Sequence, residues 1–294
     1  MSECKVIQIE TPKKYILDGL LLGPKKTKTA FIFIHGLGGN LFSQMKLADS
    51  LASKKSSVIV FNNRGFGTIN RIKKINKKSP KGYENITGGF AHEVFTDCVD
   101  DIDGAVNYAL KMGAKEIILV GHSTGCQKSI YYLSKRQKTK VSGAILLAPM
   151  SDFADMFALT EAKKYKKLIA TAKHMVKNNK SSELMPTNLW PIPTDAQRFL
   201  SLFLPESIEE IFSYASGKEP KILKSVKKPL LVILAGNDEH GDRPITEIST
   251  WFKNALIGKE TEIKIINQAL HNFMGHVSGL QKIIRNCLIL LHRF

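Results

Sequence analysis

The sequence predicts an α/β fold in which a mostly parallel central sheet is flanked by helices. Apolar runs such as residues 30–34 and Leu230–Ala235 lack polar alternation, as is typical of strands that are buried on both faces. Segments with apolar residues at helical spacing separate these runs. Strands that alternate with helices of this length indicate βαβ units and therefore parallel strand pairing.

The first half of the chain is predicted to open with an antiparallel hairpin and to continue with alternating strands and helices. A lysine-rich stretch is expected to form a loop. Gly113 is expected to cap the C-terminus of the helix over residues 92–112. The hairpin covers residues 6–9 and Tyr15–Leu22, the strands are residues 30–34 and 58–62, the helices are residues 42–53 and 92–112, and the loop is residues 71–81.

The second half continues the alternation but is interrupted by a proline-bearing segment without strand-like runs. We expect this segment, about residues 151–225, to be a helical cap inserted between two core strands. Residues 1–294 would then form a single domain, with the core in residues 1–150 and 226–294. The predicted strands are residues 116–120, 141–148, Leu230–Ala235 and 262–267, and the predicted helices are one that ends at Leu133 and Val277–Leu291.

Composition narrows the classes of function. The 294 residues carry a formal net charge of +17, but lysines recur along the whole chain and no nucleic-acid-binding motif accompanies them, so we expect no nucleic-acid partner. The four cysteines are widely spaced, which argues against a zinc site and a disulfide framework. Neither a secretory signal nor an apolar run of roughly 18 residues is present. We expect a cytoplasmic protein without a membrane span, metal or other cofactor; the oligomeric state stays open.

The sequence GHSTG at residues 121–125 lies between a buried strand and an amphipathic helix. It is a G-x-S-x-G motif in the strand–turn–helix context that this motif requires. A serine on such a turn is raised above the edge of the sheet, and the N-terminus of the following helix favours developing negative charge. The motif predicts Ser123 as the nucleophile of a serine hydrolase.

Two backbone N–H donors are needed to hold the oxyanion of an acyl-transfer reaction. The residue after the nucleophile, Thr124, is expected to supply one of them. The loop HGLGG at residues 35–39 follows an early strand, and Leu37 in that loop is the expected second donor. Its glycines allow the backbone to approach the reacting carbon closely.

A serine nucleophile also needs a histidine base and a carboxylate that orients this base. In this class of enzyme the order along the chain is serine, acid, histidine. Asp238 lies in the loop after a late strand and is the expected acid, with Glu239 and Asp242 as alternatives. His271 follows the last strand and is the expected base, with His276 as the alternative.

With these residues assigned, the chain resembles the α/β-hydrolase superfamily across nearly its full length. More narrowly, GGFAHE at residues 88–93 and IEEIFSYASG at residues 208–217 are similar to the uncharacterised DUF1749 group, near which fungal siderophore-hydrolysing esterases are placed. The resemblance implies an α/β-hydrolase fold and carboxylic-ester hydrolysis without fixing a substrate. The superfamily motifs are HGLGG at 35–39, NRGFG at 63–67, GHSTG at 121–125, GNDEH at 236–240 and ALHNF at 269–273.

The expected partner is therefore a small-molecule ester. His271 takes the proton of Ser123 as the hydroxyl attacks the acyl carbonyl, and water then releases the acid from an acyl-enzyme. Acyltransferases, thioesterases, peptidases and amidases use the same triad on this fold, so these activities are alternatives. A catalytically silent, ligand-binding protein is a further alternative.

The expected cap is rich in large apolar side chains, which either line an acyl or aromatic pocket or pack the cap onto the core. Its lysines 163, 164, 166, 167 and 173 are interpreted as a solvated face, with an anionic substrate or membrane surface as the alternative partner. Cys126 is expected to be a small core residue. The large apolar residues are Met150, Phe153, Met156, Phe157, Leu189, Trp190, Phe199, Leu202, Phe203 and Phe212.

Overall fold

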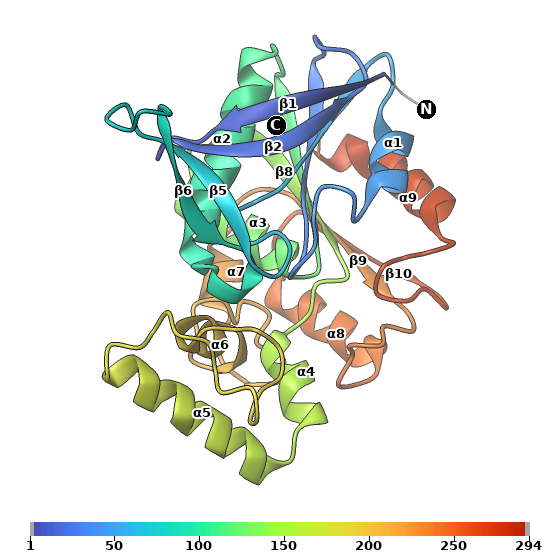
Figure 1. Ribbon diagram of the computed structural model, residues 1–294. Helices are drawn as coiled ribbons and strands as arrows, with labels where there is room; N and C mark the ends of the chain where they lie inside the picture. Colours follow the sequence, from blue (N-terminus) through green and yellow to red (C-terminus); the bar gives the residue numbers. More distant parts are fainter. Residues whose placement is uncertain (1–2, 292–294) are drawn as a thin grey trace.

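The computed structural model describes residues 3–291, and this part of the chain contains one sheet of ten strands. The strands are β1 Cys4–Glu10, β2 Tyr15–Leu22, β3 Thr29–Ile34, β4 Ser56–Phe61, β5 Asn70–Ile75, β6 Tyr83–Gly88, β7 Glu116–His122, β8 Val141–Leu147, β9 Leu230–Ala235 and β10 Thr261–Ile266. Their order is β10-β9-β8-β7-β3-β4-β2-β5-β6, with β1 paired to β2 (Figure 1). The strands from β10 to β4 pair in parallel, which confirms the predicted sheet.

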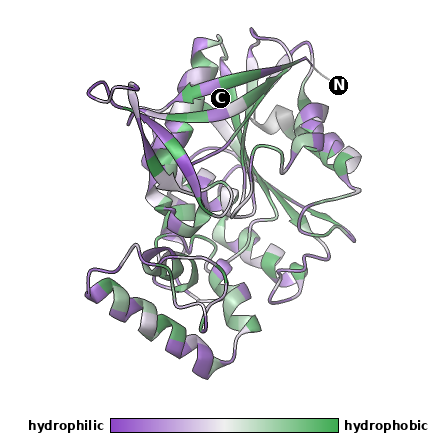
Figure 2. Ribbon diagram, viewed as in Figure 1, coloured by the Kyte–Doolittle hydropathy of each residue, from purple (hydrophilic) through white to green (hydrophobic). Residues whose placement is uncertain are grey.

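Helices cover both faces of this sheet. Apolar residues of α1 and α9 pack on one face, and those of α2, α3 and α8 pack on the other. Figure 2 shows the strands of the sheet centre as largely hydrophobic, whereas the helices carry hydrophobic and hydrophilic residues in alternation. The helices are α1 Met45–Leu51, α2 Cys98–Lys111, α3 Thr124–Lys135, α4 Asp152–Leu159, α5 Ala162–Lys177, α6 Ala196–Phe203, α7 Lys221–Ser225, α8 Ile245–Ala255 and α9 Val277–Leu291, together with the 3-10 turns η1 Phe90–His92 and η2 Phe95–Asp97.

The prediction of one helix over residues 92–112 is wrong in its first part. The helix α2 begins at Cys98, and Glu93 has an extended backbone with φ −65° and ψ 129°. The Glu93 carboxylate binds Lys128 and Arg198 in the interior. Because these ion pairs need Glu93 to point inward, the backbone turns there and the helix starts after the turn. The helix expected over residues 42–53 is likewise shorter, and forms as α1.

The predicted loop over residues 71–81 is wrong in its first part, because residues 71–75 belong to β5, which pairs antiparallel with β6, whereas residues 76–81 lie in the turn between the two strands. Ile72 pairs with Ile86 across the hairpin and is 4% exposed. The buried isoleucine lies between the exposed Arg71 and Lys73, so basic residues occupy the solvent face of β5, which lies between β2 and β6 in the sheet.

A buried network of charges joins the helical insertion of residues 151–225 to the core. Arg198 of α6 binds both Glu209 and, at 2.8 Å, Glu93, whose other oxygen lies 2.5 Å from Lys128 of α3. Arg198 and Lys128 are 0% exposed, and the two carboxylates are 2% and 7% exposed. Burial raises the pKa of Glu93, but the two cations outweigh it and bring the pKa to about 2. Two charges of each sign therefore compensate one another in the interior.

We predict that Glu93→Gln lowers the free energy of unfolding by about 3–5 kcal/mol, because it leaves Lys128 and part of Arg198 without a counter-charge. Denaturant titration measures this change. The matched control is Glu10→Gln, which breaks the exposed pair with Lys14 and should have little effect. Equally small effects of the two substitutions would show that the buried network contributes nothing beyond a surface ion pair.

Candidate active site

The turn between β7 and α3 holds Ser123 in a strained backbone conformation. Its φ is 54° and its ψ is −127°, outside the regions that L-residues prefer. A Cβ at Gly125 would lie 2.1 Å from the carbonyl oxygen of Ile34, and one at Gly121 would lie 2.4 Å from the carbonyl oxygen of Gly125. The two glycines therefore allow this turn to lie against the end of β3.

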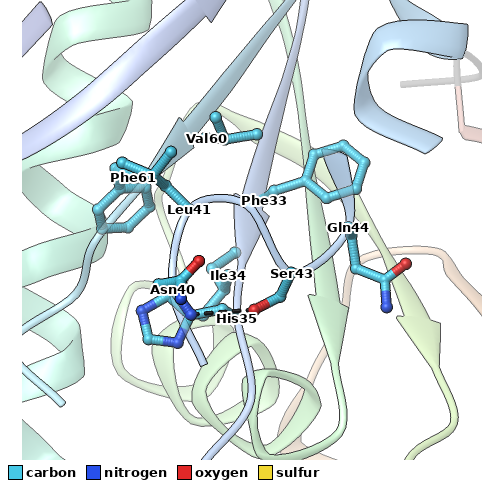
Figure 3. Close-up of a pocket in the computed structure, with 9 residues that line it drawn as sticks. All are labelled: Phe33, Ile34, His35, Asn40, Leu41, Ser43, Gln44, Val60 and Phe61. Atoms are coloured by element: carbon cyan, nitrogen blue, oxygen red, sulfur yellow. Dashed lines mark hydrogen bonds between the residues drawn. The ribbon is translucent and has the colours of Figure 1, made fainter. Parts of the chain in front are cut away.

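The loop after β3 lies directly beside the serine. A Cβ at Gly36 would lie 2.8 Å from the Ser123 Cβ and 3.3 Å from its Oγ. Further along the loop, the Asn40 N–H donates to Ser43 Oγ at 2.9 Å (Figure 3). The absence of a side chain at Gly36 leaves room for a substrate at the hydroxyl.

His35, at the start of this loop, is buried and has a structural role. Its Nδ1–H donates to the Gly36 carbonyl at 2.9 Å, and its Nε2 accepts from the Asn63 N–H at 3.2 Å. Burial lowers the pKa of His35 to about 4. The neutral ring satisfies both hydrogen bonds in one tautomer and ties the loop after β3 to the loop after β4.

Ser123 opens into a cavity of about 450 Å³. The expected oxyanion donor Leu37 and the expected base His271 line the same cavity. Within residues 3–291 neither the Leu37 N–H nor the Thr124 N–H donates a hydrogen bond to another protein group. The full lining is Gly36, Leu37, Gly39, Ser43, Gln44, His122, Ser123, Met150, Asp152, Asp155, His240, His271 and Asn272.

Asp238 orients His271 from behind the cavity. The His271 Nδ1–H lies 2.9 Å and 3.0 Å from the two carboxylate oxygens of Asp238. The alternative acids have other partners, because Glu239 accepts from the backbone N–H of His271 at 2.8 Å and Asp242 binds Arg243 at 2.7 Å. The ring is thereby held in the tautomer whose Nε2 can accept a proton.

His276, the alternative base, is not among the cavity-lining residues, and its backbone N–H bonds the Phe273 carbonyl just before α9. The Ser123 hydroxyl contacts the Met150 sulfur at 4.0 Å and makes no hydrogen bond to His271 in the described part of the chain. Hydrogen bonds between a candidate serine nucleophile and its base are commonly long or poorly aligned without substrate and tighten when substrate binds.

Two further histidines surround His271, and the sequence analysis gave neither a role in the site. The His122 Nε2–H donates to the His271 carbonyl at 2.9 Å, and the two ring centroids are 5.0 Å apart. The His240 ring packs edge-on against His271 at 4.8 Å, and its backbone N–H donates to Asp238 at 3.1 Å. Both residues restrict the position of the imidazole. Their positions within the motifs GHSTG and GNDEH, next to Ser123 and Asp238, were the sequence signal that could have predicted this role.

Two aspartates of α4 contribute to the remaining wall of the cavity. Asp152 and Asp155 reach the cavity from α4, and Asp152 accepts a hydrogen bond from Gln127 at 3.0 Å. Burial, reinforced by Glu209, raises the pKa of Asp152. Burial likewise raises the pKa of Asp155, and nearby His240 partly offsets this. The sequence analysis missed both aspartates, although their three-residue spacing in the first turn of a helix after a core strand was a signal.

Most of the large apolar residues named for the insertion pack within it instead of lining a pocket. Of that set, Met150 alone lines the cavity beside Ser123. Trp190 and Phe203, for example, pack edge-on against Phe199 with centroids 5.2 Å and 4.9 Å away. An apolar acyl pocket built from these side chains is therefore wrong for this cavity.

Three other observations bear on the chemistry of the site. The Cys126 thiol is buried 3.3 Å from the Gly121 and Leu147 carbonyls, and burial raises its pKa well above the ordinary value. Within residues 3–291 no group of three or more His, Cys, Asp or Glu side chains is arranged to hold a metal ion. No helix in the described chain is long and apolar enough to cross a membrane.

Comparison with known proteins identifies one family and many similar folds. The family model described as "Protein of unknown function (DUF1749)" matches residues 85–291, and no curated protein sequence matches the chain. The α/β hydrolase GrgF from Penicillium sp. sh18 has a TM-score of 0.65 at 15% identity, covering 99% of this chain and 98% of that one. A thermophilic esterase from Thermogutta terrifontis has a TM-score of 0.59 at 18% identity, with coverages of 98% and 99%. Est1E from Butyrivibrio proteoclasticus, solved with ferulic acid, has a TM-score of 0.63 at 14% identity, with coverages of 96% and 98%. The fold is thus that of the α/β hydrolases.

The position of His122 predicts a pH-dependent stability. Burial lowers its pKa to about 4 in the folded state, against about 6.5 in the unfolded chain. The unfolded state binds the proton first, so stability is fully present above about pH 6.5 and is lost as the pH falls toward about 4. Denaturant titrations at several pH values should show this loss. His35 contributes in the same window, so His122→Gln should make the decline shallower without abolishing it; an unchanged decline contradicts this role of His122.

Proposed function

Because this chain belongs to the DUF1749 family and has the α/β-hydrolase fold, we propose that it is a serine hydrolase that cleaves carboxylic esters through an acyl-enzyme on Ser123. One observation carries the proposal: Ser123 and His271 line a common cavity, and both carboxylate oxygens of Asp238 lie within hydrogen-bond distance of His271 Nδ1. The Thermogutta terrifontis protein and other structural neighbours are named esterases, which is consistent with this chemistry.

The reaction begins when His271 Nε2 accepts the proton of the Ser123 hydroxyl while Oγ attacks the acyl carbon. The N–H groups of Leu37 and Thr124 donate to the oxyanion, each typically lowering the barrier by about 3–4 kcal/mol. Asp238 stabilises the imidazolium that forms, and His271 then returns the proton to the departing alcohol. Water, activated by the same imidazole, releases the carboxylic acid and restores Ser123.

Within this proposal, residues 151–225 act as a cap on a single domain whose core is residues 1–150 and 226–294. Asp152 and Asp155 of this segment form one wall of the cavity, and the buried ion pair of Arg198 with Glu93 holds the segment against the core. The cavity volume of about 450 Å³ suits a small or medium ester. Its mixed polar lining favours a substrate that carries polar groups near the scissile bond.

The nucleophile is tested with a panel of p-nitrophenyl esters of increasing acyl length. The wild-type protein should turn over the shorter members, and Ser123→Ala should lower kcat by about 10⁶-fold, to background, with an unchanged fold by circular dichroism. Aryl thioesters and anilides in the same panel separate ester cleavage from the alternative activities. If the protein cleaved anilides or thioesters but no esters, it would be an amidase or a thioesterase instead of an esterase. Turnover retained in Ser123→Ala would show that Ser123 is not the nucleophile.

Two neighbouring carboxylates provide a matched test of the acid. Asp238→Asn should lower kcat by about 10⁴-fold, as the equivalent change does in serine proteases, because the wrong tautomer of the base is stabilised. Glu239→Gln is the control, since the glutamine oxygen can still accept from the His271 N–H. The control should lose far less activity. Similar losses in both variants would mean that Asp238 has no special part in orienting the base.

A further inference from the structure

Helix α5 exposes a strongly cationic face. Its residues, Ala162–Lys177, include six lysines and no aspartate or glutamate. The apolar stripe of the helix is buried within the insertion and lies opposite most of these lysines. Figure 1 shows α5 at the outer end of the insertion, away from the sheet. The cationic face consists of Lys163, Lys166, Lys167, Lys173 and Lys177, all of them exposed.

The charges of this face have no partners within the described chain. None of the five lysines forms an ion pair with any residue in 3–291, whereas nearby Lys180 pairs with Glu183 at 3.1 Å. Lys163 and Lys167 are one helical turn apart, as are Lys173 and Lys177. Like charges at this spacing destabilise a helix, so the face gains stability from an external anionic partner.

Exposed apolar side chains adjoin the N-terminal end of this face. Phe157 is 51% exposed and Leu159 is 79% exposed at the end of α4. The Phe157 ring packs edge-on against Tyr165 of α5 with centroids 5.5 Å apart, which holds the end of α4 against the first turns of α5. A patch that combines bulky apolar tips with unpaired lysines matches the boundary between the headgroups and acyl chains of a lipid bilayer.

We propose that the cationic face of α5, together with Phe157 and Leu159, docks the protein onto an anionic phospholipid membrane. The lysines bind the acidic headgroups, and the two apolar side chains enter the interface. The exposed Leu159 distinguishes this surface from a nucleic-acid site, because an aliphatic side chain gains nothing from contact with a phosphate backbone. The inference goes beyond the proposed hydrolase activity and does not depend on it.

The docked orientation also relates the membrane to the cavity. Asp155 lines the cavity, and Leu159 lies four residues later on the same side of α4. A membrane bound at Leu159 is therefore one helical turn from the cavity wall. An amphiphilic ester in the bilayer would reach the cavity over a short path.

Cosedimentation with vesicles tests the proposal, with phosphatidylcholine vesicles compared with vesicles that also contain phosphatidylserine. The wild-type protein should bind the anionic vesicles at low salt and dissociate at high salt. The triple variant Lys166→Glu/Lys173→Glu/Lys177→Glu should lose at least about tenfold in vesicle affinity. The matched control is Lys77→Glu/Lys78→Glu/Lys81→Glu in the exposed β5–β6 turn, which changes the net charge equally. The control should retain most of the binding.

Leu159→Gln completes the test, because its side chain is exposed and its loss leaves the fold intact. This variant should bind anionic vesicles several-fold more weakly, with unchanged binding to a generic single-stranded RNA. Absence of vesicle binding, equal loss in the two triple variants, or RNA binding tighter than vesicle binding would each overturn the proposal. Circular dichroism checks that each variant is folded. The two triple variants and Leu159→Gln should turn over a water-soluble ester at the wild-type rate.

Discussion

The close approach of the β7–α3 turn to the end of β3 is the steric constraint on which the candidate site depends. Ile34 and Gly121 are register partners in adjacent parallel strands, and no side chain fits between the Ile34 carbonyl and Gly125. This contact sets the serine beside the loop after β3, where Gly36 again has no space for a Cβ. The candidate nucleophile and both candidate oxyanion donors are therefore placed by backbone packing.

Electrostatics divides the molecule into regions with different tasks. In the network around Arg198, two cations and two carboxylates compensate one another, which makes it possible to bury these ions between the insertion and the core. The cavity carries acidic side chains, with Asp152 and Asp155 on α4 facing the histidines of the site. The excess positive charge of the chain is instead on the surface, for example on α5 and in the turn between β5 and β6. A net charge of +17 is thus compatible with a locally acidic cavity.

Much of the fold follows from local sequence patterns, because the strands of the sheet centre are continuous apolar runs and the motifs after β3, β7, β9 and β10 lie at strand ends. The order of Ser123, Asp238 and His271 along the chain was enough to predict that they would gather at one edge of the sheet. Tertiary contacts decide the rest. The delayed start of α2 depends on the buried partners of Glu93, and the aspartates of the cavity depend on how α4 leaves β8. A single sequence shows neither the buried partners of Glu93 nor the direction in which α4 leaves the sheet.

The central claim is that Ser123 is an activated nucleophile, and covalent labelling tests it without knowledge of the substrate. A fluorophosphonate probe should add once to the intact protein, and peptide mass spectrometry should place the adduct on Ser123. Labelling should be slowed strongly by His271→Ala, because the hydroxyl then has no base. Absence of an adduct, or an adduct that maps to another residue and persists in Ser123→Ala, would contradict the account.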